Sequence, residues 1–192
     1  MEIILTATHA ALEAAWREHC GDLPGVRVHR GSILDVDADA WVSPANSRGV
    51  LGGGVDLVYA RHFGPGLERR LRGEIERAHG GELAVGAAGI VPTALPAGTG
   101  RPPWLIAAPT MRRPMRIVGT DHAYRAAAAV LGLIGRAWLP DAPWAAEIGA
   151  RPVADVVRRV AFPGLGTGTG GLPAGECAAQ VRQAILAWGP LP

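Results

Sequence analysis

The sequence has few cysteines, few aromatic residues and no long apolar runs. Only 2 of its 192 residues are Cys, and Phe, Trp and Tyr together make up 5%. Cys20 and Cys177 each fall in a predicted helix and give no support for a structural disulfide, so we expect two buried thiols. No apolar run approaches membrane-spanning length, and the N-terminus lacks a charged-then-apolar leader. We therefore expect a cytoplasmic protein with no membrane partner.

Charge and motif content exclude several other classes. The 19 Lys and Arg residues against 17 Asp and Glu give a net charge of +2, too small to argue for general nucleic-acid binding. There is no nucleophile elbow around a Ser or Cys. The six histidines are scattered and lack the spacing of metal ligands, so we expect no metal site. They are His9, His19, His29, His62, His79 and His122.

The length fits one domain, residues 1–192, in which strands and helices alternate. Apolar and β-branched runs predict strands at 2–6, 26–29, 39–43, 86–94, 104–108 and 159–163. Amphipathic spacing predicts helices at 9–19, 55–63, 67–79, 121–138 and 173–188, with Thr120 as the cap of the fourth. This alternation indicates an α/β fold with a largely parallel or mixed sheet and helices on both of its faces.

The most informative stretch connects the strand at 39–43 to the helix at 55–63. Pro44 ends the strand, and Asn46 places a side-chain amide just beyond the strand end. A first glycine loop, residues 52–54, then allows a ligand to approach the backbone closely, since glycine has no Cβ. The start of the following helix offers free N–H groups and a positive dipole end, which favour an anion such as phosphate. The candidate ligand contacts are Asn46, Gly52, Gly53, Gly54 and Val55, and Asp56 lies in the first helical turn.

A second glycine loop, residues 164–171, repeats this arrangement between the strand at 159–163 and the helix at 173–188. Ligands of such sheets bind at the carboxyl ends of the strands, where both loops lie. Two loops could hold one diphosphate from both sides. The candidate contacts here are Gly164, Gly166, Thr167, Gly168, Thr169 and Gly170. Neither loop follows the Gly-x-Gly-x-x-Gly pattern of a Rossmann-type NAD enzyme.

Both loops resemble the phosphate loops of macrodomains. Ser43-Pro-Ala-Asn46-Ser47 and Leu51-Gly-Gly-Gly-Val-Asp56 are similar to the N-A-A-N-S and G-G-G-V-D signature, and Pro163-Gly-Leu-Gly-Thr-Gly-Thr-Gly-Gly-Leu-Pro173 resembles the second loop. The likeness runs from about residue 26 to 188. It implies a single three-layer α/β/α macrodomain with a mixed, largely parallel central sheet.

The resemblance also implies the ligand and the chemistry. Macrodomains bind ADP-ribose, and many hydrolyse it from proteins or nucleic acids without a metal or other cofactor. Asn46 would contact the distal ribose, and Asp56 would orient or activate water near C1″ of that ribose. These two are the catalytic candidates. The residues alone leave two alternatives open: Asn46 could fix a turn through its own backbone, and Asp56 could cap the N–H groups of its helix.

Three departures from the family pattern stand out. Ser32 replaces an Asp that takes the adenine amino group, and the nearby Asp35 is out of register. Tyr59 stands where a His often follows the Gly-Val-Asp step. Gly170 stands where many hydrolytic members carry an aromatic residue that packs on the distal ribose, which opens space for a bulkier acceptor.

We therefore expect a monomer that binds ADP-ribose or an ADP-ribosylated protein and hydrolyses mono-ADP-ribose, with a nucleic-acid acceptor left open. The alternatives are a binding module without turnover and a hydrolase of a small derivative, such as ADP-ribose 1″-phosphate or an O-acyl-ADP-ribose. Two segments are rich in charge. The basic loop with Arg112, Arg113 and Arg116 fits either a solvated surface or a role in binding, whereas we expect the charged face of the helix at 67–79 to be solvated.

Overall fold

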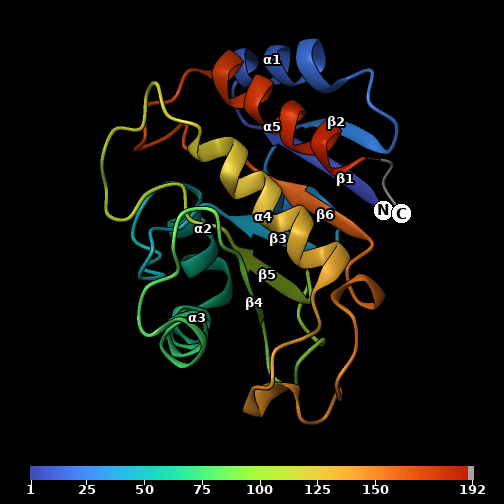
Figure 1. The fold of residues 1–192 in the computed structure, drawn as a ribbon, viewed down its shortest axis with the longest axis vertical. Helices are drawn as coiled ribbons and strands as arrows, with labels where there is room; N and C mark the ends of the chain where they lie inside the picture. The colour runs from blue at the N-terminus through green and yellow to red at the C-terminus, as the bar shows by residue number, and fades with distance from the viewer. Residues whose placement is uncertain (190–192) are drawn as a thin grey trace.

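The computed structural model describes residues 1–189 and contains a central six-stranded sheet (Figure 1). Its order is β2-β1-β6-β3-β5-β4, and every neighbouring pair is parallel except β4 and β5, which are antiparallel. The mixed, largely parallel sheet predicted from the sequence is thus confirmed. The strands are β1 (Glu2–Ala7), β2 (Val26–Arg30), β3 (Ala40–Ser43), β4 (Gly89–Pro92), β5 (Trp104–Ala107) and β6 (Arg159–Phe162).

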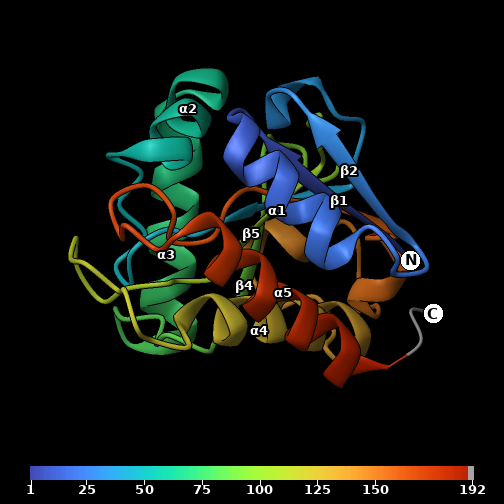
Figure 2. The same cartoon turned by 90° about the horizontal axis from the view of Figure 1, so that it is seen from above.

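Helices cover both faces of the sheet and make three layers (Figures 1 and 2). One face packs against α1 (Ala10–Cys20), α4 (His122–Arg136) and α5 (Ala174–Trp188), and the other against α2 (Gly54–Phe63) and α3 (Pro65–His79). Strand residues alternate between the two cores: in β3, Trp41 lies in the α2–α3 core, whereas Val42 lies in the opposite one. This period of two is the geometry of an extended chain.

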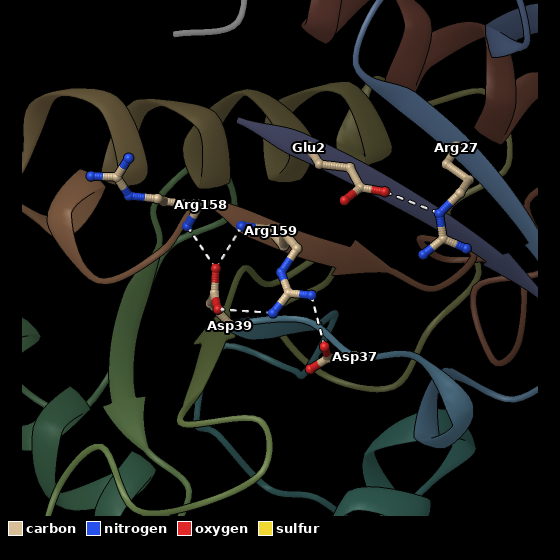
Figure 3. A network of polar contacts seen from close by, with 6 residues as sticks. All are labelled: Glu2, Arg27, Asp37, Asp39, Arg158 and Arg159. Atoms are coloured by element: carbon tan, nitrogen blue, oxygen red, sulfur yellow. Dashed lines mark hydrogen bonds and ion pairs between the residues drawn. The ribbon is translucent and has the colours of Figure 1, made fainter.

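A polar network fastens the amino ends of the central strands (Figure 3). Asp39 Oδ2 accepts hydrogen bonds from the backbone N–H groups of Arg158 and Arg159, at 2.9 and 2.8 Å. The Arg159 guanidinium also lies 2.8 Å from Asp37 Oδ2. The network joins the start of β6 to the start of β3. It therefore leaves the carboxyl ends of these strands as the open end of the sheet.

Several local predictions need correction. Strand β4 begins at Gly89, because Gly86 has a positive φ of 94° and lies in a turn closed by the Ala87 N–H bond to the Ala84 carbonyl. The charged face of α3 is not wholly solvated, since Glu74 is buried and pairs with Arg77 at 2.6 Å. The cap position of α4 is Asp121, although the Thr120 hydroxyl accepts a hydrogen bond from the His122 N–H at 3.4 Å.

The rest of the connecting chain is irregular, with three short 3₁₀ helices at Ile33–Asp35, Pro143–Ala145 and Val153–Asp155. Cys20 and Cys177 are both buried free thiols, which confirms that prediction. Within residues 1–189, no helix has the length and apolar character needed to cross a membrane.

Candidate functional site

A cleft of about 720 Å³ opens at the carboxyl ends of the central strands. Four connections that follow parallel strands contribute to its wall: Thr8 follows β1, Asn46 follows β3, Thr110 follows β5 and Gly164 follows β6. Parallel strands end at the same edge of a sheet, so their following loops converge there. The cleft is thus a product of strand order.

Every residue predicted to contact the ligand lies in the wall of this one cleft. The structure brings together Asn46, Gly52, Gly53, Gly54, Val55 and Asp56 from the first loop and Gly164, Gly166, Thr167, Gly168, Thr169 and Gly170 from the second. The two glycine loops are more than 100 positions apart in the chain, and β6 lies beside β3 in the sheet. Their binding roles remain predictions.

The first glycine loop presents the start of α2 to the cleft. Gly53 is the N-cap residue, with extended backbone at φ −159° and ψ 162°, and no side chain caps the helix. A Cβ atom on Gly53 would meet nothing within 4 Å, and its φ is open to any residue. Gly54, in contrast, has a φ of 56° that favours glycine. The fold therefore requires Gly54 but does not require Gly53.

In the second glycine loop, too, the fold requires some of the glycines and leaves others unexplained. At Gly166 a Cβ would lie 2.4 Å from Ile117 Cδ1, and at Gly170 it would lie 2.5 Å from the Gly166 carbonyl oxygen. Ile117 also donates its N–H to the Gly170 carbonyl at 2.9 Å, which ties this loop to the segment before α4. Gly168 alone of these has open space around a would-be Cβ. Close packing accounts for the absence of an aromatic side chain at Gly170.

Asp56 is the buried carboxyl group of the cleft, with 8% of its surface exposed. Ser43 Oγ donates a hydrogen bond to Asp56 Oδ1 at 2.6 Å. Burial raises the pKa of Asp56 from 3.8 to about 7, although the bond from Ser43 acts in the opposite direction. Among the described residues, the hydrogen bond of the Asp56 side chain is the one from Ser43, and no N–H group of α2 bonds to this carboxyl group, although Asp56 lies in the first turn of the helix. A carboxyl group with this pKa can exchange protons at neutral pH.

Asn46 and Thr167 use their side chains within their own loops. Asn46 Nδ2 donates to the Val50 carbonyl at 2.9 Å, and Asn46 Oδ1 accepts from the Arg48 N–H at 3.1 Å. Thr167 Oγ1 donates to the Gly164 carbonyl at 3.3 Å. Asn46 thus fixes a turn, as one alternative held, and it also lines the cleft.

Two departures from the family pattern have clear structural positions. Ser32 lines the cleft and closes a capping box with Asp35: its Oγ accepts the Leu34 N–H, and its own N–H donates to Asp35 Oδ2. Tyr59 is fully buried beneath the cleft, where its hydroxyl donates to the Val42 carbonyl at 3.0 Å. Tyr59 therefore belongs to the core that supports α2.

The basic loop contributes less to the cleft than its arginines suggested. Arg112 forms an exposed two-pronged pair with Glu82, at 2.7 and 2.9 Å. Arg116 lies against Gly171. The loop's own contributions to the cleft wall are Thr110, Met111 and Pro114.

Sequence reasoning missed several residues of the site. Ser43 was part of the quoted motif, but nothing in the sequence linked it to Asp56. Other wall residues also escaped notice, because they belong to no motif: Thr6, Thr8, His9, Leu12 and Ile33. The available signal was their position around the end of β1, at the start of α1 and in the 3₁₀ helix Ile33–Asp35. Residues 1–189 bring together no group of three His, Cys, Asp or Glu side chains suited to a metal ion.

Comparisons with known proteins identify the family. The sequence model of the Macro domain matches residues 42–181, so the chain belongs to the macrodomain family. A protein of Aquifex aeolicus (strain VF5) is 33% identical over 165 residues, which cover 86% of this chain and 83% of that protein.

Solved structures show the same fold at lower sequence identity. The macrodomain of Mycobacterium tuberculosis DarG is similar, with a TM-score of 0.59 and 21% identity over 83% of this chain and 88% of that one. A variant of the Oceanobacillus iheyensis macrodomain, solved with ADPR, gives a TM-score of 0.60 and 20% identity over 82% of this chain and 74% of that one.

Proposed function

We propose that this macrodomain binds ADP-ribose in the cleft between its two glycine loops and hydrolyses mono-ADP-ribose from modified proteins. The diphosphate would lie between the two loops, and the distal ribose would lie beside Asn46 and Asp56. Gly53 and Gly168 are the observation that carries the proposal. One lies in each loop, both line the cleft, and neither packing nor backbone conformation explains why glycine is present.

A ligand that approaches the backbone explains both glycines, because a side chain at either position would occupy its place. The uncapped start of α2 adds N–H groups that suit a phosphate. Solved macrodomains support the choice of ligand, since a variant of the Oceanobacillus iheyensis macrodomain was solved with ADPR, that macrodomain itself with ADP, and the Trypanosoma brucei macrodomain with ADP.

In the proposed reaction, water attacks C1″ of the distal ribose while the bond from C1″ to the acceptor atom breaks. Asp56, in its ionised form, takes a proton from the attacking water, and this proton is then passed to the leaving acceptor atom, directly or through solvent, which returns Asp56 to its ionised form. The products are ADP-ribose and the unmodified protein. Asp56 is suited to this role because its pKa of about 7 makes both of its forms available at neutral pH. The reaction needs no metal ion, so EDTA should leave the rate unchanged.

The test is release of ADP-ribose from a mono-ADP-ribosylated protein by wild type and Asp56→Ala. Wild type should clear the substrate, and the variant should lose at least a hundredfold in rate, which is about the contribution of one general base. Asp141→Ala, which removes an exposed carboxylate, is the matched control and should keep full activity. Full turnover by Asp56→Ala would disprove the role given to Asp56.

The absence of an aromatic side chain at Gly170 is the observation that favours the non-catalytic alternative, and close packing excludes such a side chain there. Tight binding of ADP-ribose without turnover of protein, nucleic-acid or small-molecule conjugates would support a binding module. Turnover of ADP-ribose 1″-phosphate or an O-acyl-ADP-ribose alone would support a small-molecule hydrolase.

A further inference from the structure

We propose that Ser43 is a positioning residue, whose hydroxyl holds the Asp56 carboxyl group in the orientation that activates water. This inference rests on the proposed hydrolase function and adds a residue to it. Ser43 does not line the cleft, so it acts through Asp56 and not on the substrate.

The geometry of the pair is direct. Ser43 is the last residue of β3 and has no exposed surface, and Asp56 lies in the first turn of α2. The 2.6 Å separation of Ser43 Oγ and Asp56 Oδ1 is short, as expected for a hydroxyl that donates to a carboxylate. Within residues 1–189, this is the one hydrogen bond that the Asp56 side chain makes. Removing it would leave a buried carboxyl group unsatisfied.

The surrounding contacts hold the main chain but do not touch the carboxyl group. Trp41 and Tyr59 stack with their ring centres 5.7 Å apart, and the Tyr59 hydroxyl bonds to the Val42 carbonyl. These contacts fix α2 against β3 on the residues that flank Ser43 and Asp56. In the described part of the chain, only the hydrogen bond from Ser43 fixes the orientation of the carboxyl group itself.

The same bond stabilises the ionised form of Asp56 against the effect of burial. Few other titratable groups face this carboxyl group in the described residues. Tyr59 lies one turn further along α2 and is coupled to Asp56 electrostatically. His9 lines the cleft from the start of α1. Loss of the Ser43 hydroxyl should therefore make Asp56 harder to ionise.

Ser47 provides a matched control. It is also buried, at 1% exposure, and its Oγ has no hydrogen-bond partner among residues 1–189. Ser47→Ala thus removes a buried hydroxyl from the same loop region without touching Asp56. Any effect of Ser43→Ala that Ser47→Ala does not share comes from the bond to Asp56.

The experiment has two readouts on wild type, Ser43→Ala and Ser47→Ala. Carboxyl ¹³C NMR titration, with the Asp56 signal assigned by its loss in Asp56→Asn, should show the Asp56 midpoint moved up by about one pH unit in Ser43→Ala only. Release of ADP-ribose from a mono-ADP-ribosylated protein should fall at least fivefold at pH 7 in that variant, with KM unchanged, and above pH 9 the loss should shrink to the part that comes from lost orientation. A merely structural role would give a loss that does not depend on pH.

An unchanged Asp56 midpoint in Ser43→Ala would overturn the proposal. If Ser43→Ala fails to fold, Ser43→Cys keeps the test, because a thiol is a weaker donor of similar size and should give a smaller upward movement. If wild type turns over no conjugate, the proposed hydrolase function fails, whereas the NMR titration still decides whether Ser43 controls Asp56.

Discussion

We predict that Asp56 makes the protein less stable at neutral pH than in mild acid and that Asp56→Asn removes this loss of stability. The unfolded carboxyl group titrates near its ordinary value of 3.8, whereas the folded one titrates near 7. Between these values the folded state holds a proton that the unfolded state has released. The free energy of unfolding therefore falls as pH rises from about 4 to about 7 and levels off above that. At 1.36 kcal/mol per pH unit, the full loss is about 4 kcal/mol.

Urea unfolding of wild type and Asp56→Asn at pH 5, 6, 7 and 8 measures this loss. The asparagine is neutral throughout and can still accept the bond from Ser43, so other titrating groups cancel in the difference. The difference in free energy of unfolding should change by about 2.5 kcal/mol in favour of the variant between pH 5 and pH 8. Phosphate and MES buffers should be avoided, because the proposed site takes anions and one solved macrodomain holds MES. A difference that stays constant with pH would refute the argument that burial controls Asp56.

Two further predictions concern the buried groups around the site. Tyr59→Phe removes the hydroxyl that bonds to the Val42 carbonyl and should lower the free energy of unfolding in urea by about 1 kcal/mol. Tyr124→Phe should lower it less, and equal losses would show that the bond from Tyr59 adds no stability. Burial raises the pKa of Cys20 to about 11 and that of Cys177 to about 12. Neither thiol should therefore react with a disulfide reagent at pH 8 until urea unfolds the protein. Rapid labelling of the native protein would contradict this prediction.

The fold was largely predictable because its signals are local. The alternation of buried strands with amphipathic helices gave the six strands and five helices to within a few residues, with the largest shift at the start of β4. That shift has a local cause, the turn at Gly86. The burial of Glu74 was not predictable, since it depends on which face of α3 meets the sheet and on a pairing with Arg77.

In the candidate site, too, some features were predictable from the sequence and others were not. Its glycines and Asn46 could be found because short motifs mark the ends of two strands. The bond from Ser43 to Asp56 could not be found, because it depends on how a helix start lies against a strand end 13 residues earlier. Nor could the sequence separate the glycines required by the fold, such as Gly166, from Gly168, whose surroundings do not require glycine.

The central claim is that the cleft binds ADP-ribose, and calorimetric titration with ADP-ribose tests it most directly. Wild type should bind saturably, and Gly53→Glu should lose binding, because the new side chain fits the fold but fills the phosphate position with bulk and negative charge. Gly73→Glu adds the same group at an exposed position of α3 that also has open space, and it should bind like wild type. Absence of binding by wild type, or equal binding by Gly53→Glu, would contradict the account.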